Sequence, residues 1–168
     1  LGGGPGPGQP FGVYRPATVP SDLVPQYVTI LGKDTKQVDS VAPVGSPIEV
    51  ELPVSGLPSG NSVTRAVPLG TVFGARSGDK GGNANLGIFA RSEEAWTWLD
   101  NELTIDRFRE LLPETTNMSI DRHRFPKIRS LNFVVQGLLE EGVAASTRQD
   151  AQAKALGEWL RARVAELP

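Results

Sequence analysis

The sequence has no cysteine and a single histidine, His123. A chain without cysteine forms no disulfide, carries no thiolate nucleophile and has no cysteine-ligated zinc site. One histidine excludes any zinc site that takes two histidines from the same chain. A Ser-His-Asp triad would have to use His123, and no G-x-S-x-G nucleophile elbow accompanies it. We therefore expect no metal site and no cofactor.

The chain also lacks long apolar runs and an excess of positive charge. No apolar run approaches the roughly 20 residues that a membrane-spanning helix requires. The opening LGGGPGPGQP has no charged segment followed by an apolar one, so we do not expect it to act as a signal peptide. The 17 basic and 19 acidic residues give a net charge of −2, whereas nonspecific nucleic-acid binding requires a basic surface. We expect neither a membrane nor a nucleic acid as partner. Because the chain does not begin with Met, we interpret it as a piece of a longer protein.

Proline is concentrated in the first 68 residues, which hold 11 of the 14 prolines. This composition predicts that residues 1–65 form an extended arm rich in Pro and Gly, the tail of a preceding domain or a linker. Two stretches in it favour strands: the apolar and β-branched residues 27–31, and residues 48–54, where apolar and other residues alternate. The arm could dock on a partner domain or subunit, or be a disordered linker.

From Ala66 onward the pattern predicts a domain, residues 66–168. Four segments have the composition of strands and would pair as two hairpins: residues 69–74, 86–90, 117–125 and 128–136. Helices should follow each hairpin, beginning at residues suited to N-caps: Ser92, Thr104, and Ser146 or Thr147. Trp98 falls outside the inward face of its helix and is expected at an interface. The order of elements predicts an α+β fold, a four-stranded antiparallel sheet with helices on one face.

The segment R-S-G-D-K-G-G-N-A-N, residues 76–85, is expected to be a polar loop that closes the first hairpin. Glycines let successive backbone N–H groups surround an anion, and two basic side chains would add positive charge. We predict that this loop binds a ligand, with these residues in contact: Arg76, Ser77, Gly78, Gly81, Asn83 and Asn85. For proton transfer the candidates are Asp79 and Lys80. The alternative is an elaborate turn whose glycines only satisfy backbone geometry.

Other polar side chains on the predicted strands are weaker candidates. Asn132, within an apolar strand, is a further candidate for ligand binding. A buried amide there needs partners that the 76–85 loop could supply, so structural satisfaction is the alternative. Arg122 and Arg124 share one strand face and could bind a carboxylate or phosphate, but a solvated sheet face is the simpler interpretation. Asp121 and His123 would share the opposite face.

Three stretches, in the same order, resemble the C-terminal domain of the acyclic terpene utilisation (AtuA) family. They are R-S-G-D-K-G-G-N-A-N-L-G-I at 76–88, L-N-F-V at 131–134 followed by Gly137, and R-Q-D-A-Q at 148–152 with Lys154. The resemblance covers about residues 66–165. The sequence departs from the family pattern at Gly82, where an acidic residue is common, and at Gln149, where a hydrophobic or basic residue is usual.

This resemblance implies a ferredoxin-like sandwich, a cytoplasmic location and a larger N-terminal AtuA domain as partner. It also implies a role in the catabolism of acyclic terpenes such as citronellol and geraniol, on CoA thioesters, but no particular reaction. Two functions are compatible with it. The domain could bind an anionic ligand in the 76–85 loop, such as a CoA phosphate or a carboxylate. It could instead be a non-catalytic module that assembles a homo-oligomer or attaches the larger domain.

Overall fold

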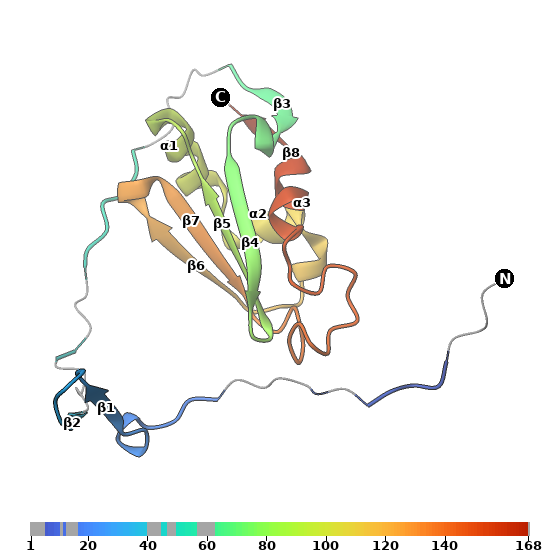
Figure 1. Ribbon diagram of the computed structural model, residues 1–168. Helices are drawn as coiled ribbons and strands as arrows, with labels where there is room; N and C mark the ends of the chain where they lie inside the picture. The colour runs from blue at the N-terminus through green and yellow to red at the C-terminus, as the bar shows by residue number, and fades with distance from the viewer. Residues whose placement is uncertain are drawn as a thin grey trace. The chain divides into compact units, whose positions relative to one another are not determined.

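A computed structural model describes residues 6–10, 12, 17–39, 45–46, 50–56 and 63–167 (Figure 1). The chain divides into two compact units, Pro16–Glu51 and a larger one that contains Leu52–Pro168. Within the described residues, none of the helices has the length and hydropathy needed to cross a membrane.

The smaller unit contains a β-hairpin in which β1 (Gln26–Thr29) pairs antiparallel with β2 (Thr35–Val38). Gly32 adopts a φ of 76° in the turn, a conformation that glycine reaches without steric cost. The strand predicted at 27–31 is confirmed in its first half, whereas β2 was not predicted. All residues of both strands are exposed.

The second strand predicted in the arm, at residues 48–54, is not supported where it can be compared. Residues 48 and 49 lie outside the described part of the chain, and residues 50–56 form no regular element. A short strand closer to the domain, β3 (Arg65–Pro68), was not predicted.

The larger unit is built on a four-stranded antiparallel sheet in the order β4-β5-β7-β6 (Figure 1). Its strands are β4 (Gly74–Lys80), β5 (Asn83–Phe89), β6 (Ile120–Phe125) and β7 (Ser130–Val135). Successive side chains of a strand point to opposite faces, and one face here is apolar. That face contributes six fully buried residues: Ala84, Leu86, Ile88, Leu131, Phe133 and Val135. The predicted α+β fold with a four-stranded antiparallel sheet is confirmed.

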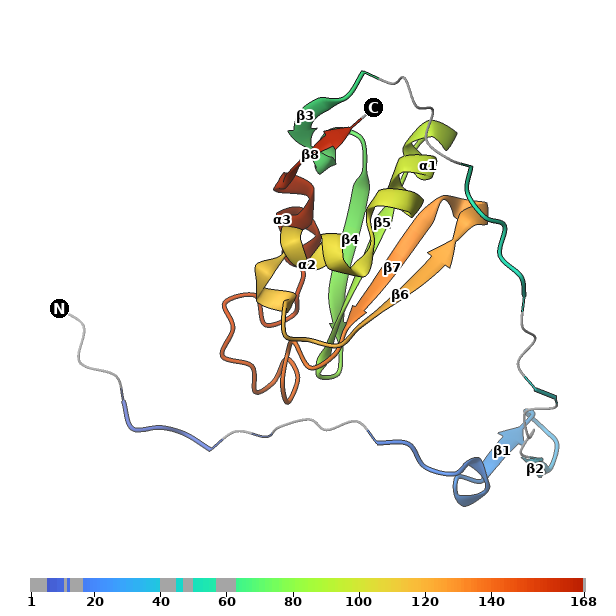
Figure 2. The same cartoon turned by 180° about the vertical axis from the view of Figure 1, so that it is seen from behind.

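Three helices cover the apolar face, as the reverse view shows (Figure 2). They are α1 (Glu93–Glu102), α2 (Ile105–Leu111) and α3 (Leu156–Ala162). The N-caps predicted at Ser92 and Thr104 are confirmed, since Ser92 Oγ accepts from the Ala95 N–H and Thr104 Oγ1 from the Arg107 N–H. The cap predicted at Ser146 or Thr147 is wrong, because α3 begins at Leu156 after Ala155. Phe108 of α2 stacks on Phe133 of β7 with ring centroids 4.3 Å apart, which fixes this helix on the sheet.

The first predicted strand begins later than expected. Residues 69–71 form a 3₁₀ turn, η2 (Leu69–Thr71), and the Phe73 N–H donates to the Leu69 carbonyl at 2.9 Å. This turn buries both Leu69 and Phe73 completely. Residues four positions apart also share a face in a strand, so the apolar pattern did not distinguish the turn from the predicted strand. Trp98 is buried as well, stacked on Phe73 at 5.4 Å between centroids, so its predicted place at an interface is wrong.

The last helix also begins later than predicted. The carboxylate of Asp150 accepts hydrogen bonds from the backbone N–H groups of Lys154 and Ala155, at 2.8 and 2.9 Å. These bonds hold a turn where the sequence pattern predicted helix. After α3 the chain forms β8 (Val164–Leu167), which pairs antiparallel with β3.

The segment 76–85 is not a loop. β4 runs to Lys80 and β5 starts at Asn83, so only Gly81 and Gly82 form the turn. Gly81 has a φ of 63°, as the first central residue of a type II′ hairpin turn requires. The glycines and polar residues predicted a loop because they favour strands poorly, yet here they occupy strand positions in a fully paired ladder.

Gly82 packs closely against the chain that follows β7. A Cβ on Gly82 would lie 2.3 Å from the Glu140 carbonyl oxygen. The Leu139 N–H donates to the Gly82 carbonyl at 2.9 Å, and the Asn83 side chain accepts from the Gly137 N–H at 2.9 Å. The turn is therefore a packing element of the fold.

We expect Gly82→Ala to lower the free energy of unfolding by about 2 kcal/mol, because the new methyl group would overlap the Glu140 carbonyl. Gly78→Ala is the matched control in the same hairpin, since its Cβ would meet no atom within 4 Å. Urea-induced unfolding of both variants measures the difference. Equal losses in the two variants would contradict the close approach at Gly82.

Candidate functional site

The face of the sheet opposite the helices carries polar side chains in a pattern set by the strand register. Gly87 of β5 pairs with Arg76 on one side and with Asn132 of β7 on the other, and Asn132 pairs with His123 of β6. Directly paired residues of antiparallel strands project to the same face. These four residues therefore form one row across the open face.

The next row along the strands contains Gly78, Asn85, Val134 and Asp121. Gly78 and Gly87 contribute no side chain, and a Cβ on either would meet no atom closer than 3.8 Å. Backbone is thus exposed between the side chains of the two rows. We call Gly78 and Gly87 together with Arg76, Asn85 and Asn132 the polar patch.

The polar patch has three polar side chains, those of Arg76, Asn85 and Asn132. None of Arg76, Asn85 and Asn132 makes a side-chain hydrogen bond or ion pair with the part of the chain that the structure describes. Asn132 is half-buried on the open face, so the expected contacts of its amide with residues 76–85 do not form. A guanidinium and two amides on one face offer donors of the kind that bind a carboxylate or a phosphate.

The structure brings together four of the predicted ligand-binding residues and separates the others. Alternation along β4 places Ser77 and Asp79 on the covered face, opposite Arg76, Gly78 and Lys80. The Ser77 hydroxyl donates to the Lys154 carbonyl at 3.2 Å and accepts from the Gly157 N–H at 2.8 Å. It thereby holds α3 on β4.

The remaining predicted residues lie at the hairpin end. Lys80 is on the open face, and its ammonium group donates to the carbonyl oxygen of Asp79 at 2.8 Å. Asp79 and Lys80 therefore project to opposite faces of the sheet. Gly81 lies in the turn, and the Asn83 side chain is engaged with Gly137.

Two aromatic residues of the open face were not among the predicted site residues. Phe89 and Phe125 both pair with Ser130 of β7 and are 39% and 47% exposed. Their period-two spacing from Gly87 and His123 was a usable signal in the sequence. The missing information was the register, which puts the two strands on either side of β7.

Arg122 and Arg124 do bind a carboxylate, but it belongs to the same chain. Both pair with Asp100 of α1, at 3.1 Å from Arg122 and 2.5 Å from Arg124. The Asp100 side chain is 4% exposed. Arg122 also donates to the backbone carbonyls of Asp100 and Leu103. The interpretation of these arginines as a solvated sheet face is wrong, because α1 covers the edge strand at this point.

The same ion pairs hold part of the arm on the domain. Arg124 donates to the Pro53 carbonyl at 2.9 Å, the Ser55 hydroxyl donates to the Asp100 carboxylate, and the side chain of Asn101 donates to the Gly56 carbonyl at 3.0 Å. We call Asp100, Arg122, Arg124 and the docked residues 53–56 the clasp.

The clasp changes the acidity of its central carboxylate. Burial by itself would raise the pKa of Asp100, but hydrogen bonds from Arg124, Ser55 and Arg122 outweigh it and lower the pKa to about 2.

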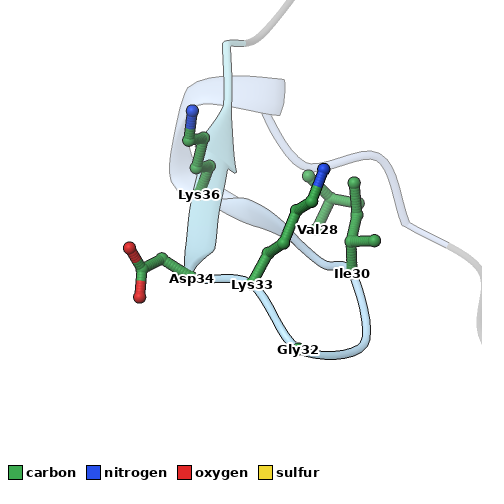
Figure 3. Close-up of a pocket in the computed structure, with 6 residues that line it drawn as sticks. All are labelled: Val28, Ile30, Gly32, Lys33, Asp34 and Lys36. Atoms are coloured by element: carbon green, nitrogen blue, oxygen red, sulfur yellow. The ribbon is translucent and has the colours of Figure 1, made fainter.

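The hairpin of the smaller unit has a surface hollow. It is lined by Val28, Ile30, Gly32, Lys33, Asp34 and Lys36 (Figure 3). Asp34 points away from the other labelled side chains, and every lining residue is exposed. In the described segments, no three His, Asp or Glu side chains are placed to hold a metal ion. The polar patch is the stronger candidate, because its polar side chains share one face of the sheet.

Comparison with known proteins agrees with the fold. The family described as AtuA ferredoxin-like domain matches residues 67–165. This match covers the four-stranded sheet, the three helices and the polar patch, and it agrees with the ferredoxin-like α+β sandwich implied by the sequence resemblance. No curated protein and no solved structure matches the chain.

The lowered pKa of Asp100 makes the clasp sensitive to acid. The native carboxylate stays ionised below the usual value of 3.8, so its stabilisation is complete above that pH and is lost as the pH falls toward 2. We expect the gap in unfolding free energy between the wild type and Asp100→Asn to shrink by about 2 kcal/mol between about pH 5 and pH 2. Urea unfolding at several pH values measures this gap. A gap independent of pH would contradict the assignment.

Proposed function

The chain belongs to the AtuA ferredoxin-like domain family, and from this membership we propose that it is the ligand-binding C-terminal module of an AtuA-like protein. The module serves the catabolism of acyclic terpenes such as citronellol and geraniol, or of branched acyl-CoA compounds. Its polar patch holds an anionic group of the CoA thioester, either a phosphate or a carboxylate. The larger N-terminal AtuA domain that the resemblance implies would complete the protein, in the cytoplasm.

One observation carries this proposal: among the residues that the structure describes, Arg76 has no acidic partner on the open face. Asp121, the carboxylate in the adjacent row, lies three strands away and accepts a hydrogen bond from the Gln136 side chain at 2.7 Å. The other arginines of the sheet, Arg122 and Arg124, are neutralised by Asp100. Arg76 is therefore the guanidinium of the sheet whose charge is available to a ligand.

The backbone between the side chains also favours an anionic group. Glycine at positions 78 and 87 lets a ligand approach the sheet directly, without meeting a Cβ. The amides of Asn85 and Asn132 stand on either side of that approach and can donate to its oxygens. Of the two residues predicted to transfer a proton, Lys80 shares this face and Asp79 does not, so only Lys80 could meet a ligand held on the patch.

A second candidate function is assembly. Phe89 and Phe125 expose apolar surface on the same open face, which a second copy of the chain or the N-terminal AtuA domain could bury. Sedimentation equilibrium separates the two functions. Assembly through this face requires a mass above that of the monomer, and the mass should decrease in Arg76→Glu.

For the ligand-binding function, we expect phosphate and CoA to shift the amide NMR signals of residues 76–78, 85–87 and 132. Arg76→Ala should weaken binding of both at least tenfold, because a charge-assisted pair is lost. The melting temperature should change little, since the side chain makes no contact that the fold needs. Asn132→Ala should weaken binding less, because its amide is neutral.

The matched control is Arg163→Ala, which removes an exposed guanidinium beyond the end of α3. It should bind phosphate and CoA as the wild type does. If Arg76→Ala and Arg163→Ala weaken the binding of phosphate and CoA equally, the cause is the loss of net positive charge and not of a specific contact. That result would overturn the assignment of the polar patch as the binding site.

A further inference from the structure

The ring of Phe89 forms a platform beside the polar patch. Phe89 pairs with Gly74 across β4 and β5, and a Cβ on Gly74 would lie 2.2 to 2.8 Å from three atoms at the tip of the ring. The ring therefore lies over the backbone of β4, where it covers a glycine that has no side chain of its own. Because Phe89 is 39% exposed, the outer side of the ring is open to solvent.

This platform adjoins the free guanidinium. Gly74 and Arg76 are successive positions of β4 on the open face, and two residues of a strand span about 7 Å. The ring over Gly74 is consequently next to the base of the Arg76 side chain. Asn85 lies diagonally across from Arg76 on β5. A flat apolar surface is thus followed directly by cationic and amide donors.

The shape of the surface distinguishes between the two ends of an acyl-CoA. An aliphatic chain needs a concave pocket that encloses most of its surface, and the platform is one face of a sheet. A nucleobase needs only one flat side, since it gains most from stacking its ring on an aromatic side chain. Its phosphate, one ribose away, would reach the guanidinium next to the platform.

We infer that the polar patch takes the nucleotide end of CoA, with the adenine stacked on Phe89 and a phosphate on Arg76. This inference rests on the proposed function and deepens it. Lys80, farther along β4 on the same face, adds positive charge beyond the patch. The acyl chain and its thioester extend away from this surface.

Phe125 provides a matched control. It is exposed on the same face to a similar extent, but the small side chain of Ser130 on β7 separates it from Phe89. Its neighbour at period two on β6 is His123, and the arginines of that strand face the other way and bind Asp100. A base stacked on Phe125 of β6 would lie three strands away from Arg76 of β4.

The experiment measures the affinity of the full chain for three probes: inorganic phosphate, adenosine 3′,5′-bisphosphate and isovalerate. We expect the bisphosphate to bind at least tenfold more tightly than phosphate. Phe89→Leu should weaken the bisphosphate about tenfold and leave phosphate unchanged, whereas Phe125→Leu should change neither. Phe89→Tyr, which keeps an aromatic ring over Gly74, should bind like the wild type even if Phe89→Leu melts at a lower temperature.

The outcomes separate the inference from the function beneath it. If phosphate binds at Arg76 and the bisphosphate binds no more tightly than phosphate, the adenine does not stack on Phe89. That result would overturn the inference but would still support an anion site at Arg76. Isovalerate bound more tightly than phosphate, and weakened by Phe89→Leu, would place the acyl end on the platform and also overturn it. No binding of any probe would refute the proposed function itself. If Phe89→Leu and Phe125→Leu change the affinity for the bisphosphate equally, Phe89 is not part of the binding site.

Discussion

The burial of one face of the four-stranded sheet under three helices is the constraint on which the rest of the structure depends. Because successive side chains of a strand point to opposite faces, each residue buried in the core places its neighbour in the strand on the open face. Leu86, Ile88, Leu131 and Phe133 are fully buried. Asn85, Gly87 and Asn132 therefore stand together on the open face, and a shift of register by one residue in any central strand would dissolve the polar patch.

The same alternation divides the side chains of the glycine-rich segment between the covered face and the open face of the sheet. Ser77 and Asp79 face the helices, and Ser77 bonds to the backbone on both sides of the start of α3. Arg76 and Gly78 face outward, where their side chains are free or missing. Gly82 and Asn83 hold the hairpin turn against the chain that follows β7. A single run of polar residues thus serves three different purposes.

The clasp joins the domain to the chain that precedes it. Its energetic centre is a buried carboxylate, which is stable in the charged form only because two arginines and a hydroxyl satisfy it. Residues 53–56 share these bonds, so the segment leading into the domain is held at the edge of the sheet next to α1. The covered face and this edge carry these structural bonds, and the open face carries the polar patch.

Composition and periodicity in the sequence determined the class of fold, both hairpins and the N-caps at Ser92 and Thr104, because these depend on neighbours a few residues apart. They also identified Arg76, Gly78, Asn85 and Asn132 as candidates. Tertiary structure decided which candidates meet. Asn132 shares a row with Arg76 only because β5 lies between their strands. Asp79 is excluded because alternation along β4 directs its side chain to the covered face. The late start of α3 is a local matter, because the Asp150 carboxylate bonds to the N–H groups of Lys154 and Ala155. The extent of β4 and the pairing of β3 with β8 were decided by the tertiary structure, because the ladder bonds outweigh local preference and, for β3 and β8, join residues distant in the sequence.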